Sequence, residues 1–88
     1  MKKHNNTLEA QRSRLLKRLQ AGPCTTTEAR HELDILGVAP RVYELRHKYG
    51  FNIQRHWVND RNPGGGHHRV AKYVLMSGRW QGGANDIA

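Results

Sequence analysis

The stretch that decides the fold is residues 25–50, TTTEARHELDILGVAPRVYELRHKYG, which predicts two helices joined by a short turn. The first helix is expected over 25–35, because a capping-box spacing opens it and apolar residues then recur at helical intervals. The second is expected to start at Pro40, since proline is favoured at the first position of a helix, and to end before Gly50. Gly37 lies in the turn between them, as in helix pairs that cross steeply.

One more helix and a hairpin flank this pair. Leucines on one helical stripe after a capping-box spacing at Asn6 predict a helix over 7–20. From Phe51 the apolar period changes to two, and residues 70–76 are rich in β-branched and aromatic side chains, so both stretches are expected to be strands. Residues 59–68 between them have the composition of a long exposed loop. The prediction is an α+β fold, three helices followed by a two-stranded hairpin, in the order of a winged helix-turn-helix.

Length and charge limit what such a chain can be. Its 88 residues suffice for one domain, expected over 7–76, between a basic flexible start (1–6) and a flexible tail (77–88). Lys and Arg number 15 against 7 acidic residues, a net charge of +8, which favours a polyanionic partner. Charge is concentrated toward the second half, since residues 35–80 hold eight of the basic and two of the acidic residues.

The low cysteine content and the lack of long apolar segments indicate the cellular compartment. Cys24 is the one cysteine, so neither an intramolecular disulfide nor a cysteine cluster for zinc can form, and a reducing, cytoplasmic location is expected. The longest apolar run, residues 73–76, is too short to cross a membrane, and the polar start lacks the apolar stretch of a signal peptide. We therefore expect no membrane partner.

Five short stretches carry a resemblance to a known family. They are RLLKRL (14–19), GPCTTTEA (22–29), RVYELR (41–46), GFNI (50–53) and HRVAKYVL (68–75). In their order and spacing they resemble a small winged helix-turn-helix family common in bacteriophages and prophages, over about residues 12–76. The resemblance implies the winged fold and DNA binding in a bacterial host cell. Leu33 stands where older helix-turn-helix proteins usually have glycine, which indicates the longer, winged type of turn.

The helix that starts at Pro40 is the expected reader of the major groove. With Val42, Leu45 and Tyr49 toward the core, a rotation of 100° per residue leaves another face for DNA. That face and its flanks comprise Pro40, Arg41, Tyr43, Glu44, His47 and Lys48. Arg41, near the helix N-terminus, is expected to pair with guanine, so that Arg41→Ala would flatten base discrimination.

Two further charged side chains of this helix have competing interpretations. Glu44 either accepts from a cytosine amino group or pairs with Lys48 one turn on. Arg46 lies nearer the core side, where a structural ion pair is favoured over a DNA contact.

The loop and the start of the first helix of the pair supply the remaining candidate contacts. Glycines 64–66 would allow the backbone of the loop to approach the sugar-phosphate backbone of DNA closely. Arginine is the side chain favoured in a narrow minor groove. The candidate wing residues are Arg61, His67, His68 and Arg69. Thr25, Thr26 and Thr27 combine hydroxyls with a helix N-terminus, a favourable seat for a phosphate, although Thr25 also has a capping role with Glu28.

Other classes of function have weaker support. Six histidines suggest a metal site, but they are scattered, His67 and His68 are adjacent, and no paired carboxylates accompany them, so no catalytic residue, metal or cofactor is expected. A winged helix can also bind RNA or a protein partner, with Tyr43, Trp57 and Trp80 as stacking platforms or interface anchors.

The resulting hypothesis is a protein that binds double-stranded DNA. It would act as a phage-type transcriptional regulator or as an excisionase-like architectural factor in recombination. One short helix and one wing cover a short site, so homodimeric or tandem binding is expected.

Overall fold

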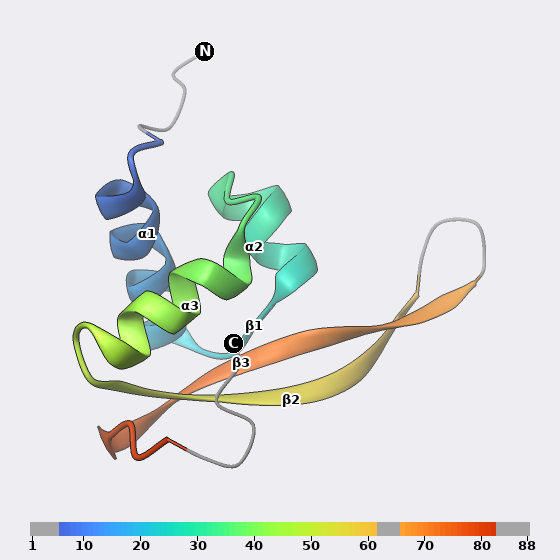
Figure 1. Cartoon of the computed structure of the whole chain (residues 1–88). Coiled ribbons are helices and arrows are strands. Elements are labelled where there is room, and N and C mark those ends of the chain that lie inside the picture. The colour runs from blue at the N-terminus through green and yellow to red at the C-terminus, as the bar shows by residue number, and fades with distance from the viewer. Residues whose placement is uncertain (1–5, 62–65, 83–88) are drawn as a thin grey trace.

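The computed structural model describes residues 6–61 and 66–82, in which three helices lie on one side of an antiparallel sheet (Figure 1). The elements are α1 (Leu8–Ala21), β1 (Cys24–Thr25), α2 (Thr26–Leu33), α3 (Val38–His47), β2 (Phe51–Arg61) and β3 (His67–Arg79). The α+β class and the three helices agree with the prediction. The sheet has three strands in the order β1-β3-β2, however, rather than the two expected. A two-residue strand such as β1 is too short to show a period in the sequence.

The first helix and its N-cap each lie one residue later than expected. Thr7, not Asn6, is the N-cap, because its hydroxyl accepts a hydrogen bond from the amide of Ala10 at 3.1 Å. Asn6 instead accepts from the guanidinium of Arg14 at 2.6 Å and from the side chain of Gln11 at 2.9 Å. No helix among the described residues is long and apolar enough to span a membrane.

Both helices of the central pair differ at their facing ends from the prediction. α2 stops at Leu33 rather than at residue 35, because Asp34 adopts the left-handed conformation (φ 55°) that ends a helix. α3 starts at Val38 rather than at Pro40, with Gly37 as its N-cap. The third position tolerates proline because the first amides of a helix have no intrahelical acceptor.

The hairpin is longer than predicted, and the loop between its strands is shorter. Residues 59–61 and 67–68 were expected in the loop, but they continue the ladder, with Asn59 opposite Arg69 and Asp60 opposite His68. The backbone groups of these residues are hydrogen-bonded between the two strands, although their polar composition is typical of a loop. β3 also continues to Arg79, three residues past the expected end of the domain. The expectations for residues 1–5, 62–65 and 83–88 lie outside the described residues.

The core forms where the helices meet the sheet. Its buried apolar side chains are Leu15, Leu19, Cys24, Ala29, Ile35, Val38, Val42, Leu45, Ile53, Ala71 and Tyr73. Val42 and Leu45 were expected there. Tyr49 was too, but it lies beyond the end of α3 and is 48% exposed. The hairpin extends past the helices at the end where β2 and β3 approach their connection (Figure 1).

Candidate nucleic-acid interface

The outward face of α3 is formed by the residues that the core leaves exposed. They are Ala39, Pro40, Tyr43 and His47, followed by Lys48 after the last turn. The rings of Tyr43 and His47 lie 4.2 Å apart, and the ring of Trp80 meets His47 edge-on at 6.3 Å. The predicted exposure of Pro40, Tyr43, His47 and Lys48 therefore agrees with the structure, and Trp80 adds an aromatic ring from beyond β3.

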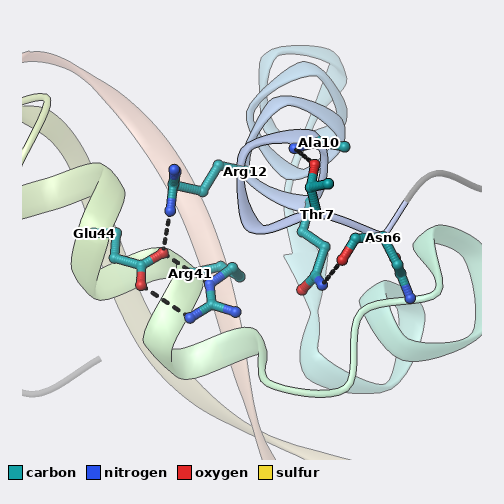
Figure 2. Close-up of polar contacts among 7 residues, drawn as sticks. Asn6, Thr7, Ala10, Arg12, Arg41 and Glu44 are labelled. Atoms are coloured by element: carbon teal, nitrogen blue, oxygen red, sulfur yellow. Dashed lines mark hydrogen bonds and ion pairs between the residues drawn. The ribbon is translucent and has the colours of Figure 1, made fainter.

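Arg41 does not belong to this face, contrary to the prediction. Its Nε donates to Glu44 Oε1 at 2.8 Å and its Nη2 to Oε2 at 2.9 Å, and the side chain is only 12% exposed. Arg12 on α1 donates to the same carboxylate at 2.9 Å, so two guanidinium groups converge on Glu44 (Figure 2). The fork that would pair with guanine is already occupied by a carboxylate of the same helix.

Glu44 pairs with Arg41 and Arg12 in this arrangement rather than with Lys48, one of its two expected partners. The hydrogen bonds from Arg41, followed by those from Arg12, hold the pKa of the Glu44 carboxyl below its ordinary value. The ammonium group of Lys48 lies 5.9 Å from the centre of the Tyr49 ring instead. The three paired groups Arg12, Glu44 and Arg41 join α1 to α3.

The hairpin carries a cluster of one tryptophan and two arginines. The guanidinium of Arg55 lies 5.0 Å from the centre of the Trp57 ring, and that of Arg69 lies 5.3 Å from it. Trp57 is 52% exposed, so both cations accompany an aromatic surface that faces solvent. Alternation along β2 and the opposition of Asn59 to Arg69 place the three side chains on one face of the hairpin.

A family model described as a winged helix-turn-helix domain matches residues 10–78, more than three quarters of the chain. The chain belongs to this winged helix-turn-helix family. No curated protein and no solved structure matched it. In the terms of this fold, α2 and α3 form the helix-turn-helix, and the β2–β3 hairpin is the wing.

The start of α2 in this winged helix-turn-helix is bound to the sheet rather than open. Thr25 caps α2 in the predicted capping box: its hydroxyl accepts from the amide of Glu28 at 3.1 Å, and the Glu28 carboxylate accepts from the Thr25 amide at 2.9 Å. Thr27 donates its hydroxyl to Asp60 of the wing at 2.9 Å, and Thr26 donates to the carbonyl of Ala71 at 3.4 Å. The three hydroxyls that were expected to hold a phosphate thus make contacts within the chain.

On the wing, the histidines and Arg69 are exposed as expected. His67, His68 and Arg69 are the first residues of β3, all on the surface. Arg61 is the last residue of β2, and its side chain lies outside the described part of the chain. Sequence reasoning did not place Arg55 and Trp57 in the wing contact, although their spacing of two residues in a strand was a usable signal.

Arg46 has a structural position, as its expected place near the core implied. It is 3% exposed, and its Nε donates to the carbonyl of Ile53 at 2.9 Å. Its guanidinium lies 4.0 Å from the centre of the Trp80 ring. These contacts join α3 to β2 and to the residue that follows β3, at the end of the hairpin opposite its connecting loop.

Neither the cysteine nor the acidic and histidine side chains form a reactive cluster in the described part of the chain. Cys24 is buried in β1, and burial raises the pKa of its thiol to about 11, so that it stays protonated near neutral pH. Among residues 6–61 and 66–82, no three His, Cys, Asp or Glu side chains are grouped so as to hold a metal ion.

Proposed function

We propose that this winged helix-turn-helix protein binds double-stranded DNA, with α3 in the major groove and the wing against the neighbouring backbone or minor groove. The observation that carries the proposal is the Trp57 cluster. It presents two arginines on a half-exposed ring on the part of the hairpin toward its tip, next to a helix of major-groove size. Arginine beside a flat ring suits a phosphate wall or a narrow minor groove.

The distribution of charge supports a long-range attraction to a duplex. The chain carries +8, and eight of its basic residues lie within residues 35–80, which include α3 and the wing. Arg12 and Arg41 are each neutralised in part by Glu44, so the wing supplies much of the charge that faces a partner. Neutralised phosphates release counterions, which makes such binding depend steeply on salt.

The proposal is tested by fluorescence anisotropy with a labelled 20-bp duplex at several salt concentrations. If five to eight phosphates are neutralised, log Kd changes with log salt with a slope magnitude of about 4 to 7, with weaker binding at higher salt. Unlabelled tRNA is then added at equal phosphate concentration. Retention of the duplex supports the proposal, whereas a slope near zero, or displacement by tRNA without any sequence preference, contradicts it.

A pair of charge-matched variants tests the surface. Arg69→Ala removes one exposed cation of the wing, and we expect it to weaken binding to all duplexes alike and to lower the slope magnitude by about 1. Lys17→Ala removes one exposed cation from α1, away from the wing, and we expect a much smaller change. Equal effects of the two variants would assign the binding to net charge instead of to the wing.

The finer role follows from the resemblance to phage and prophage proteins. We infer a small transcriptional regulator or an excisionase-like architectural factor, acting in the bacterial cytoplasm as a homodimer or in tandem copies. Selection of bound sequences from randomised duplexes distinguishes these roles. A palindrome supports a dimer and direct repeats support tandem binding, whereas bending of the selected duplex supports the architectural role.

A further inference from the structure

The outward face of α3 is poor in charge for a helix proposed to lie on DNA. Of the ten residues Val38–His47, all of them described, the exposed ones carry no fixed charge. The two arginines of the helix are withdrawn from it: Arg41 is held by Glu44, and Arg46 is buried beneath Trp80. Bidentate pairing of arginine with guanine is therefore not offered by this face.

Apolar groups occupy the face instead. Leu36, in the turn before α3, is 79% exposed, the highest value among the exposed large apolar side chains. Pro40 and Tyr43, three residues apart, share the outward face of the helix, and Leu36 precedes them in the turn; we call these three side chains the apolar row. Tyr43 is 49% exposed. An apolar row in which no side chain is covered by the chain's own core indicates a partner with apolar groups of its own.

We propose that Leu36, Pro40 and Tyr43 read the C5-methyl groups of thymine in the major groove, so that the protein selects A·T-containing sequences. The inference rests on the proposed function. Thymine methyls are the apolar groups on the floor of the major groove, and apolar side chains are their usual contacts. Phosphates border that floor on both sides, and the protein carries exposed cations for them at Lys48, after the last turn of α3, and at Arg69 on the wing.

Charge favours a duplex over a second copy of the chain on this face. Two copies that each carry +8 repel one another, whereas a duplex attracts the same charge. A neutral protein partner would cover the apolar row and leave the flanking cations without a counterpart. Thymine-containing DNA offers methyl groups to the apolar side chains and phosphates to the cations.

The experiment replaces thymine by uracil, which removes only the C5-methyl group and keeps the base pair. Sequences are first selected from randomised 20-bp duplexes, and the best-bound ones are made again with uracil in place of thymine. We expect a loss of affinity of about fourfold for each methyl group that α3 contacts, the equivalent of one buried methylene. Replacing cytosine by 5-methylcytosine at a neighbouring step of the groove should restore part of the loss.

Variants assign the effect to α3. Leu36→Ala changes an exposed turn residue, and we expect it to weaken thymine duplexes and to reduce the ratio of uracil to thymine dissociation constants toward one. Tyr43→Phe keeps the ring and should keep the ratio. Arg69→Ala should weaken binding to both duplexes and also leave the ratio unchanged.

The outcomes separate the two proposals. If duplexes bind with a steep salt dependence but uracil has no effect, or if the selected sites are G·C-only and need Arg41, the thymine inference is overturned and DNA binding stands. If no duplex binds under any condition, both are overturned. A uracil effect that Leu36→Ala leaves at full size would place the methyl contact elsewhere in the protein and also overturn the assignment.

Discussion

At the scale of single residues, the carboxylate of Glu44 has the widest consequences, because it accepts from Arg41 on its own helix and from Arg12 on α1. Both partners lower its pKa in the folded chain relative to the ordinary value of 4.5. A lowered folded-state pKa adds stability above pH 4.5, and this contribution is lost as the pH falls through the folded-state value.

We predict that Glu44→Gln lowers the free energy of unfolding near pH 7 by less than about 1 kcal/mol, since the cluster lies near the surface and salt screens it. The difference from the parent protein should shrink as the pH falls from 4.5 through the lower folded-state pKa, below which the carboxyl is protonated in both states. Urea unfolding of both proteins from pH 7 to below pH 4.5 measures this difference in the free energy of unfolding. A difference that stays constant with pH would show that the contacts of Glu44 do not act through its charge.

Gly50 is a second residue whose identity the backbone requires. Its φ is +78°, and a Cβ there would lie 3.0 Å from Nη2 of Arg79. Gly50→Ala is predicted to destabilise the fold by about 1–2 kcal/mol, the cost of a left-handed conformation for a residue with a side chain. Gly37→Ala is the control without a positive φ: its Cβ would meet only Pro40 at 3.7 Å, and a smaller loss, below about 1 kcal/mol, is expected because glycine is preferred to alanine at an N-cap. Chemical denaturation of both variants checks the difference.

The sequence predicted which side chains of α3 are exposed better than it predicted which polar side chains are already paired within the protein. Helical geometry correctly predicted that Tyr43 and His47 are exposed, because rotation per residue is the same in every helix. The i, i+3 spacing of Arg41 and Glu44 was a local signal for their pairing, whereas the second partner of Glu44, Arg12, comes from a helix 32 residues away. Likewise the hydroxyl of Thr27 finds its acceptor, Asp60, on the distant wing.

At the scale of elements, α2 depends on its capping box. Thr25→Ala is predicted to lower the free energy of unfolding by about 1 kcal/mol, because it leaves the amide of Glu28 without its side-chain acceptor. Thr25→Ser keeps the hydroxyl oxygen and should be nearly neutral. Thermal and urea unfolding of the pair provide the test, and equal losses in the two variants would assign the effect to the methyl group of Thr25.

The start of α2 was easier to predict than its end or the length of the hairpin. The capping box at Thr25 is a local signal, so the N-terminus of α2 was predicted to within one residue. The end of α2 depends on the left-handed Asp34, which is not the residue type that most strongly indicates a helix end. The length of the hairpin depends on pairing between strands, and the polar residues 59–61 give no sign of it.

At the scale of the whole molecule, the domain ends later than its apolar residues suggest. The amide of Trp80 donates to the carbonyl of Gly50 at 3.0 Å, and its ring covers the guanidinium of Arg46. We predict that a chain ending at Met76 melts about 5–10 °C below one ending at Gly82, since it loses these contacts and the end of β3. Scanning calorimetry compares the two chains. Equal melting temperatures would place the boundary at Met76 after all.

The unbroken course of β3 has a mechanical consequence. This one strand starts in the wing at His67, crosses the core at Tyr73 and ends beside α3, where Trp80 follows it and touches Arg46. One hydrogen-bonded strand therefore links the wing to the C-terminal end of α3. If the protein binds DNA as proposed, we expect this link to keep the distance between the two surfaces constant, so that the width of the groove affects binding as well as the bases in it.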